Sequence, residues 1–251
     1  MIYAIGDLHL GLALDKPMDR FGAAWAGHHL LIAEHWRRTV TEADTVILTG
    51  DSSWAMREDD FAPDFAFLQA LPGRKVLVQG NHDYWWASTG RLNALDANML
   101  FLKSSFTRAE GLHICGTRGW LCPGAQGFTA QDEKLYRREL LRMRRALEAA
   151  MTDGAADILV AMHFPPMNEA LAPSGFTDLF TEFPVRQVVY GHLHGEGGFA
   201  RRVERESESI HGVRYRLVSC DYLQFQLANI TAKEASGAEP ERQPKEATLR
   251  A

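Results

Sequence analysis

The chain has few cysteines, and none of them is placed to hold zinc. Its 251 residues include only Cys115, Cys122 and Cys220, and no pair of these has the spacing of a zinc motif. An odd and scattered set of thiols is typical of a reducing compartment, where cysteine serves as a small core residue rather than in a disulfide framework. A cysteine-based metal site is therefore not expected.

Long apolar runs and a signal peptide are also missing from the sequence. No apolar run approaches the roughly 18 residues needed to span a bilayer, and no basic segment precedes the first strand-like run. We therefore expect a soluble cytoplasmic protein with no membrane partner. The formal net charge is −5, so the whole molecule lacks the positive charge of a polyanion binder, although a local basic groove is compatible with it. No oligomeric state follows from the sequence.

The chain contains no internal repeat and no linker between domains. Hydrophobic residues make up 46% of it, which is enough for a substantial core. The composition changes only at the C-terminal end, where the residues from Lys233 onward are mostly polar and small and have no apolar period. This composition predicts a disordered tail over residues 233–251. We expect a single domain over residues 1–232.

Residue types that bind metals follow five short apolar runs of the sequence. Asp7 and His9 follow run 2–5, Asp51 follows run 46–48, Asn81 follows run 76–78, His163 follows run 158–162, and His192 and His194 follow run 188–190. Sites in open α/β sheets form at the carboxyl ends of the strands, so these side chains are expected to converge. If the backbone stays extended after the first run, Asp7 and His9 leave it on the same face.

The remaining segments predict helices between the strands and a change of pattern near the end. Helices are expected over residues 23–40, 59–71 and 88–97 and from Thr129 onward, further strands over 99–102 and 112–115, and a loop or short helix over 173–183. After residue 195 we find no crossover helices. The strand-like segments 199–203, 209–218 and 222–230 therefore predict a meander, with His211 and Gly212 in a turn.

The helix that begins after Thr129 has the clearest period. Thr129 and Asp132 resemble a capping box, with Asp in the place of Glu or Gln. Apolar residues repeat at helical spacing, and six cations occupy the rest of the surface: Lys134, Arg137, Arg138, Arg142, Arg144 and Arg145. Nucleic-acid contact is one interpretation of that charge. A solvated outer face is favoured, because lysine and arginine routinely lie on protein surfaces.

The residues at the strand ends form a chemically coherent set of two carboxylates, four imidazoles and one amide. Carboxylate and amide oxygens suit hard ions, whereas imidazole suits Mn, Fe, Co, Ni and Zn. The set is too large for one tetrahedral zinc ion but suits two ions about 3.5–4 Å apart, an arrangement used in phosphate-ester cleavage. Asp51 stands alone at its strand end and is the natural bridging ligand. Each residue taken singly would more often be a turn, core or surface residue; the ordered set reverses that interpretation.

These motifs resemble the signature of the calcineurin-like metallophosphoesterase superfamily. The matching motifs are Asp7-x-His9, Gly50-Asp51, Gly80-Asn81-His82-Asp83, His163 and Gly191-His192-x-His194, in the order of the family and within residues 1 to about 230. The resemblance implies an α/β fold, a four-layer α/β/β/α sandwich with two mixed β-sheets and the site at the strand ends. It also implies two divalent ions, Mn²⁺ first and Fe, Zn, Ni or Co as alternatives.

The resemblance further implies a division of the ligands and a catalytic role nearby. Asp7, His9, Asp51 and His194 would hold one ion, and Asp51, Asn81, His163 and His192 would hold the other. His82 would lie near the phosphate and the leaving group, with Asp83 orienting its imidazole. Many members carry an acidic residue three positions after the bridging Asp, where this chain has Trp54. The surroundings of the metals therefore need not match those of the well-known branches.

Aromatic and basic residues in the nearby loops are candidate substrate contacts. Trp54, Trp85 and Trp120 fall near the expected mouth of the site, as does Trp86. They would stack on a flat leaving group or simply pack within their loops. Arg118, in a glycine-rich loop, would clamp a phosphate through two parallel hydrogen bonds or pair with a surface carboxylate.

The sequence thus predicts a cytoplasmic, di-metal-dependent phosphoesterase. A metal-bridging hydroxide would hydrolyse a phosphate monoester or diester, with a small nucleotide-like ester among the candidate substrates. One alternative is a nuclease, which needs a basic groove beside the site and which the acidic balance does not favour. The other is a non-catalytic metal-binding scaffold. Such a protein would be expected to lose site residues, above all at the position of His82, and here every position is filled.

Overall fold

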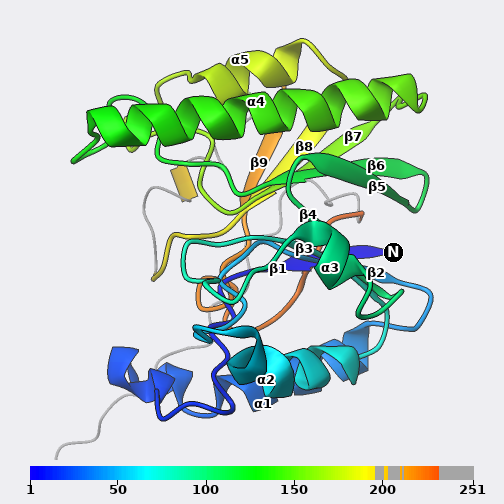
Figure 1. The fold of residues 1–251 in the computed structure, drawn as a ribbon, viewed down its shortest axis with the longest axis vertical. Helices are drawn as coiled ribbons and strands as arrows, with labels where there is room; N and C mark the ends of the chain where they lie inside the picture. Colours follow the sequence, from blue (N-terminus) through cyan, green and yellow to red (C-terminus); the bar gives the residue numbers. More distant parts are fainter. Residues whose placement is uncertain (196–200, 203–209, 211, 232–251) are drawn as a thin grey trace, which may run out of the picture.

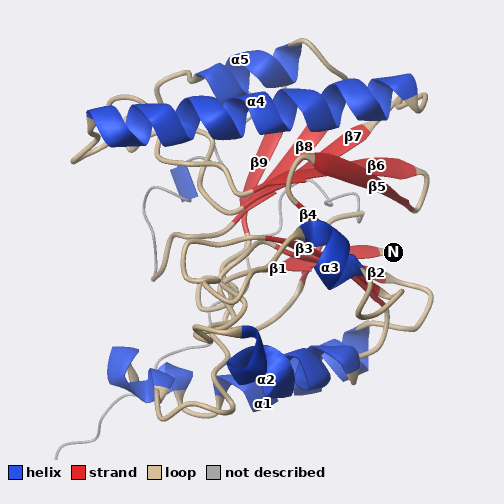
Figure 2. Ribbon diagram, in the orientation of Figure 1, coloured by secondary structure: helices blue, strands red, loops and turns tan. Residues whose placement is uncertain are grey.

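The computed structural model describes residues 1–195, 201–202, 210 and 212–231. The described chain forms four layers, with helices on the two outer sides and two β-sheets between them (Figures 1 and 2). Each sheet contains both parallel and antiparallel strands. The four-layer α/β/β/α sandwich with two mixed sheets is confirmed.

The first sheet is built around the N-terminal strand. Its order is β10-β1-β2-β3-β4, with bounds Ala228–Asn229, Ile2–Ile5, Thr45–Leu48, Arg74–Val78 and Met99–Leu102. The second sheet has the order β5-β6-β7-β8-β9, with bounds Ser105–Ala109, Leu112–Thr117, Ile158–Met162, Val185–Tyr190 and Arg214–Leu217. Strands β1 to β4 are mutually parallel, and so are β6 to β9. Within each parallel set, the carboxyl ends therefore lie at one edge of the sheet.

Helices cover the outer face of each sheet. Helices α1 (His28–Thr39) and α2 (Glu58–Gln69) lie below the first sheet in Figure 1, and α4 (Ala130–Thr152) and α5 (Gly175–Thr181) lie above the second. The short helix α3 (Thr89–Asn93) precedes β4. None of the helices in the described part of the chain is both long and apolar enough to cross a membrane.

Strands β1 to β4 and β6 to β8 are buried over most of both faces, which explains their largely apolar sequences. In β1, Tyr3 and Ile5 pack with the helices of the first sheet, whereas Ile2 and Ala4 pack in a core between the two sheets. This alternation follows from the period of two residues in a strand. A third core lies between the second sheet and α4 and α5. The three cores fix the two sheets and thereby the edge where their strands end.

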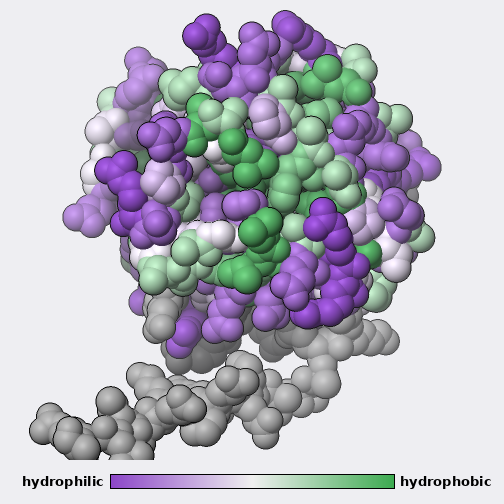
Figure 3. Space-filling view, turned by 90° about the horizontal axis from the view of Figure 1, so that it is seen from below, coloured by the Kyte–Doolittle hydropathy of each residue, from purple (hydrophilic) through white to green (hydrophobic). Residues whose placement is uncertain are grey.

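The outer face of the helical layer under the first sheet is partly apolar. Figure 3 views the molecule from below and shows apolar surface interspersed with polar surface. Leu30 and Leu31 of α1 are 64% and 47% exposed, and Phe21, in the 3-10 turn Met18–Phe21, is 68% exposed. Scattered apolar residues are normal on protein surfaces.

The caps of two helices agree with the sequence, whereas some helix bounds differ. The Thr129 hydroxyl accepts a hydrogen bond from Asp132 N at 3.3 Å, and Thr129 N donates to Asp132 Oδ2 at 2.9 Å, which confirms the capping box. Ser88 caps α3, but that helix is shorter than expected. The helix expected over residues 23–40 begins at His28 instead. Gly27, with φ 64°, separates it from a 3-10 turn over Ala23–Trp25.

The expected C-terminal meander is wrong. Strand β9 pairs in parallel with β8, residues 221–225 form turns, and β10 crosses to the first sheet, where it runs antiparallel to β1. Arg201 and Arg202 are helical. The rest of segment 199–203, the predicted turn residue His211 and the predicted tail over 233–251 lie outside the described residues. The sequence pattern identified residues that form strands, but it does not determine which strands pair. Pairing depends on which strand has an edge with free backbone groups, and the free edge of β1 pairs with β10.

The two sheets are joined directly where their parallel strands end. Gly6 N donates to Val218 O at 2.7 Å, and Cys220 N donates to Gly6 O at 2.9 Å, so the end of β1 is bridged to the end of β9. Glycine permits the close approach at two neighbouring places. A Cβ on Gly80 would lie 2.0 Å from Asp51 Oδ1, and one on Gly191 would lie 2.4 Å from Asp7 Oδ2.

Adding a methyl group at Gly80 should therefore damage the site edge specifically. Gly80→Ala would also place its Cβ 2.1 Å from Asp51 N, and we expect it to destabilise the protein by about 1–3 kcal/mol, as overpacking does, and to displace Asp51. The matched control is Gly90→Ala, because a Cβ on Gly90 in α3 meets nothing within 4 Å. Thermal unfolding and metal content measure both effects. Equal effects of the two substitutions would contradict the close approach.

Candidate functional site

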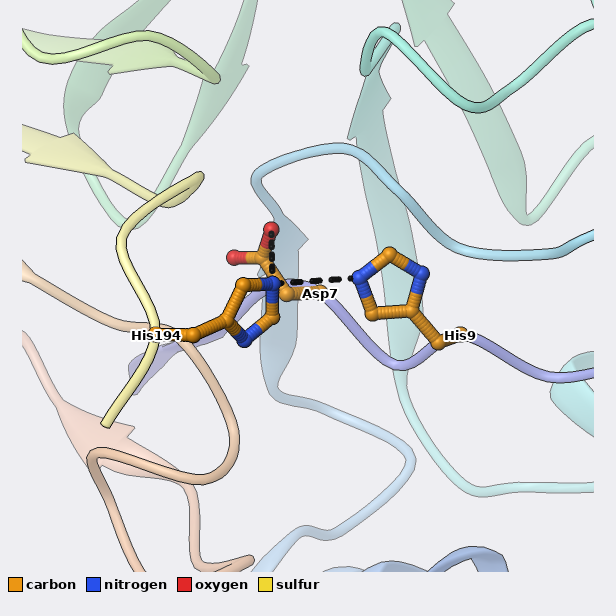
Figure 4. A group of neighbouring side chains, drawn as sticks. All are labelled: Asp7, His9 and His194. Atoms are coloured by element: carbon orange, nitrogen blue, oxygen red, sulfur yellow. Dashed lines mark hydrogen bonds and ion pairs between the residues drawn. The ribbon is translucent and has the colours of Figure 1, made fainter. Parts of the chain in front are cut away.

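The seven strand-end residues converge where the two sheets meet. Asp7, His9 and His194 form one group, in which the ligand atoms all lie within 4.8 Å of one another. His9 Nε2 is 3.2 Å from His194 Nε2, which is 3.9 Å from Asp7 Oδ1 (Figure 4). Figure 4 shows the two imidazoles reaching toward each other from opposite sides, with the carboxylate beside them. Two imidazole nitrogens and a carboxylate oxygen thus surround one point.

A second group of donors lies next to the first. His163 Nε2 is 2.7 Å from Asn81 Oδ1 and 3.2 Å from His192 Nδ1. Asp51 Oδ2 is 3.6 Å from the same His163 nitrogen and 3.9 Å from His9 Nε2. A single oxygen of Asp51 therefore lies between the two groups.

The backbone turns sharply at these residues rather than staying extended. Asp7, His9, Asp51 and His192 have φ values of 55°, 44°, 49° and 73°. The expectation that an extended backbone puts Asp7 and His9 on one face is therefore wrong. Left-handed backbone at residues other than glycine costs about 1–3 kcal/mol each and concentrates at functional sites. The turns after the strands, and not the pleat of the strands, aim these side chains.

The electrostatics of the site call for a cation. Asp7 and Asp51 are 0% and 2% exposed, and within the described residues their only ion-pair partners are histidines. Burial, and then the charge of Asp51, raise the pKa of Asp7 to about 8. Burial also raises the pKa of Asp51. Buried carboxylates without a cation are costly, and a bound divalent ion would remove that cost.

Three of the four imidazoles are in the state that metals bind. Burial lowers the pKa of His163 and His192 to about 3, and it lowers the pKa of His9 far below the ordinary value. These rings are therefore neutral at physiological pH and keep a lone pair. His163 Nδ1 lies 3.0 Å from Thr49 O, so it donates its proton there and leaves Nε2 free toward the other donors.

Two further residues support the ligands, and sequence reasoning missed both. Asp221 Oδ1 lies 3.2 Å from His194 Nδ1, which leaves Nε2 of that ring facing Asp7. Burial, the largest single influence, lowers the pKa of His194, but the hydrogen bond with Asp221 and the charges of Asp7, Asp221 and Asp51 together raise it. Ser219 Oγ donates to Asp7 Oδ2 at 2.8 Å. Both residues follow the end of β9, so they share the sequence pattern of the candidate ligands, which is a polar residue just after a strand.

His82 and Asp83 adjoin the site in different ways. His82 is half-buried, its backbone N donates to Asp51 Oδ1 at 2.8 Å, and its ring makes no hydrogen bond to a described residue. The expected orientation of His82 by Asp83 is absent. The buried Asp83 carboxylate instead accepts N–H groups at 2.7–3.3 Å, from the backbone of Gly80, Ser52 and Ser53 and from the indole of Trp85. Asp83 therefore ties the loop after β3 to the loop after β2.

The tryptophans divide into wall and core. Trp54 stacks on His9 with ring centroids 4.7 Å apart, and it lies 4.6 Å from the His82 ring, so it forms part of the site wall. Trp85 is 2% exposed and stacks on Phe61 at 3.5 Å, and Trp86 is 9% exposed. Trp85 is thus a core residue, and the expected substrate contact is wrong because no substrate can reach a ring that is buried.

Arg118 and Trp120 form a contact beside His163. The Arg118 guanidinium lies 4.5 Å from the centroid of the Trp120 ring, and the Trp120 indole N–H donates to Asp132 at 2.9 Å. The backbone carbonyl of Arg118 accepts hydrogen bonds at 3.0 Å from the N–H groups of His163 and Phe164. Arg118 is therefore held next to a candidate metal ligand, while Trp120 supports it from the other side.

A cavity of about 330 Å³ opens on the other side of the site, beside His9. Its walls come from the segment after His9 and from the start of α1. They include Lys16, Met18, Trp25, His28 and His29. The lining mixes aromatic, apolar and charged side chains, so the space can hold an organic group attached to a phosphate.

Comparison with known proteins agrees with this geometry. The family described as calcineurin-like phosphoesterase matches residues 1–196. The chain belongs to the calcineurin-like phosphoesterase family. Membership supports a metal-dependent phosphoesterase in general, and the candidate ligand groups lie where such an enzyme needs them.

Comparison with individual proteins supports the calcineurin-like phosphoesterase assignment less strongly than the family match does. The chain is 36% identical over 113 residues to the Gene 66 protein of Mycobacterium phage D29, covering 43% of this chain and 54% of that protein. The chain thus matches only about half the length of this curated relative. The crystal structure of AQ665, a protein of unknown function from Aquifex aeolicus, matches with a TM-score of 0.51 and 15% identity over 91% of this chain and 94% of that one. That likeness supports the fold alone.

Replacing Asp221 should weaken metal binding without removing a ligand. In Asp221→Asn the amide cannot hold the His194 ring as the carboxylate does, and partners of this kind typically contribute about 10–100-fold in metal affinity. Calorimetric titration of metal-free protein with Mn²⁺ measures the change. Asp178→Asn, an exposed carboxylate in α5, is the control and should bind as the wild type does. Equal affinity of Asp221→Asn and wild type would show that Asp221 does not support the site.

Proposed function

We propose that the chain hydrolyses phosphate esters with two divalent metal ions. Asp7, His9, Asp51 and His194 would hold one ion, and Asp51, Asn81, His163 and His192 would hold the other. The observation that carries the proposal is the position of Asp51, whose Oδ2 lies 3.6 Å from His163 Nε2 and 3.9 Å from His9 Nε2. When bound, such ions supply Lewis-acid stabilisation and an activated water. Mn²⁺ is our first candidate, with Fe, Zn, Ni or Co as alternatives.

The chain itself supplies the proton and the positioning. In hydrolysis, water adds its oxygen to phosphorus, the bond to the ester oxygen breaks, and that oxygen takes up a proton. His82 is half-buried beside the wall formed by Trp54 and His9, with ring centroids 4.6 and 5.8 Å away. With no hydrogen-bond partner of its own among the described residues, its imidazole is free to give that proton. Asp83 acts indirectly, because it fixes the loop that carries His82.

The surroundings favour a small organic phosphate ester as the substrate. The cavity of about 330 Å³ beside His9 offers room for the leaving group, and Trp54 gives the site an aromatic wall. All three cysteines are buried and unpaired, which supports a cytoplasmic location, where thiols stay reduced.

Metal stoichiometry and activity test the proposal together. We expect two ions per chain, and turnover of 4-nitrophenyl phosphate or bis(4-nitrophenyl) phosphate after reloading with Mn²⁺, Fe²⁺, Co²⁺, Ni²⁺ or Zn²⁺. Elemental analysis gives the stoichiometry, and anomalous diffraction locates the ions. One tetrahedral ion, or ions that do not contact Asp51, would contradict the bridging role, and no turnover with any metal would contradict the function.

Replacing His82 should separate proton transfer from metal binding. We expect His82→Ala to keep both ions and to lose roughly 10²–10⁴ in turnover, the usual contribution of a positioned acid. The loss should be smaller for 4-nitrophenyl phosphate than for an alkyl phosphate, because nitrophenolate barely needs a proton. Asp51→Asn is the comparison and should lose metal as well as rate. If His82→Ala loses a metal ion, His82 is a ligand; if both esters slow equally, it is not the proton donor.

A further inference from the structure

Two cations occupy strand ends that the metal centre does not use. Lys103 directly follows β4, and Arg118 directly follows β6. Both strands are parallel to the strands that carry the metal ligands, β4 to β3 and β6 to β7. Because parallel strands end at the same edge, both cations lie at the edge of their sheet where the metal centre lies.

Helix α4 brings two more cations to the same place. Glu139 is 0% exposed and anchors the helix, because it accepts a hydrogen bond from Thr117 Oγ1 at 2.6 Å. Arg142 and Arg138 approach the other Glu139 oxygen at 2.5 and 3.4 Å. On the opposite flank, Ser104 Oγ donates to the carbonyl of Arg142 at 3.1 Å. Thr117 and Ser104 are the chain neighbours of Arg118 and Lys103, so all four cations gather around one buried carboxylate.

This group, which we call the cation cluster, carries more positive charge than its own carboxylate neutralises. Lys103, Arg118, Arg138 and Arg142 contribute four charges and Glu139 removes one, which leaves +3 beside the site of a chain whose net charge is −5. Lys103 and Arg118 form no ion pair with a described residue, and Arg118 Nε is buried without a partner. Burial, and in part repulsion among these cations, lower the pKa of both side chains. An anion placed here would relieve the repulsion.

The other cations of α4 behave differently. Arg137 pairs with Glu133, and Arg144 forms two hydrogen bonds to Glu182 at 2.7 and 2.8 Å. Lys134 and Arg145 are exposed. These four match the solvated outer face expected from the sequence. The cation cluster is therefore one specific part of the helix rather than its general surface.

The cation cluster begins at the metal centre. The Arg118 carbonyl accepts hydrogen bonds from His163 N and Phe164 N at 3.0 Å, so the residue is fixed next to a candidate ligand. Its charge also acts on His163 and Asp51. The cavity beside His9 opens in the first sheet and its helices, whereas the cation cluster belongs mainly to the second sheet and α4. A substrate held at the metals can thus reach the cavity with one end and the cation cluster with the other.

We propose that the cation cluster binds a second phosphate group of the substrate, next to the phosphate that is cleaved. The inference rests on the proposed phosphoesterase function and narrows its substrate class to esters with at least two phosphates. A nucleoside diphosphate and a nucleic-acid strand both present this chemistry. Guanidinium and ammonium groups bind phosphate through charge-assisted hydrogen bonds, and arginine can do so with two parallel bonds.

The test compares substrates with one and two phosphates. The probes are 4-nitrophenyl phosphate, a nucleoside diphosphate and a short single-stranded oligonucleotide, each with the metal-loaded protein. In Arg138→Gln we expect kcat/KM for a two-phosphate probe, relative to 4-nitrophenyl phosphate, to fall roughly tenfold through KM, as the loss of one charged hydrogen bond predicts. Arg138→Lys should recover part of this ratio. Arg142 is left intact, because its loss would leave buried Glu139 with weaker pairing.

Two further variants separate the effect of the cation cluster from the effect of general surface charge and from effects on folding. Arg145→Gln removes an exposed charge from the same helix and should leave the ratio as in the wild type. Lys103→Met tests the cation cluster from β4, independently of α4, and should lower the ratio in the same direction. The two sources of the second phosphate differ in salt dependence, because a strand that contacts several phosphates loses affinity steeply with added salt.

The outcomes distinguish the two proposals. If wild type hydrolyses 4-nitrophenyl phosphate but neither Arg138→Gln nor Lys103→Met changes the ratio, the second-phosphate site is wrong and the phosphoesterase function stands. The same conclusion follows if Arg145→Gln lowers the ratio as much as Arg138→Gln does. If wild type hydrolyses none of the probes with any metal, the proposed function fails, and this inference fails with it.

Discussion

The structure depends on two carboxylates buried at the edge where the sheets meet. Asp7 accepts hydrogen bonds from His192 N at 3.0 Å and so links β1 of the first sheet to the loop after β8 of the second. Asp51 accepts His82 N at 2.8 Å and fixes the loop after β3. Asp7 Oδ1 also faces His163 and His194, and the second oxygen of Asp51, Oδ2, faces His163 and His9. The carboxylates that fix the edge of the sheets are thus also the carboxylates that would hold the metals, so the fold and the site cannot be optimised separately.

This arrangement explains where local strain is tolerated. Asp7, His9, Asp51 and His192 adopt left-handed backbone, and Gly80 approaches Asp51 more closely than a Cβ would allow. Such conformations persist only when the surrounding structure fixes them. Here the strands before them are buried on both faces by three apolar cores. The rigid sandwich therefore holds the turns, and the turns hold the donors in place before any metal binds.

The sequence predicted the features that depend only on the order of the strands. It failed for the features that depend on contacts between segments far apart in the chain. Seven candidate ligand positions could be identified because each follows an apolar strand, and parallel strands bring their ends together. Asp221 and Ser219 carry the same signal, but they were missed because β9 was expected in a meander. The resemblance implied a catalytic role for Asp83, and the position of Trp85 in a loop near the expected mouth made it a candidate substrate contact. Their partners, backbone N–H groups for Asp83 and Phe61 for Trp85, come from segments that no local pattern specifies.

The net charge of the chain is likewise a poor guide to the class of substrate. The chain carries −5 overall, which argued against polyanions. At physiological ionic strength, however, exposed charges are largely screened beyond about 8 Å, so a substrate responds to the charges around its own site. Acidic residues such as Glu58, Asp59 and Asp60 lie in the first turn of α2, on the outer helical layer. The cation cluster lies beside the candidate ligands, around Arg118. The field at the metal centre is therefore set by how β4, β6 and α4 pack together, and the composition of the chain does not determine it.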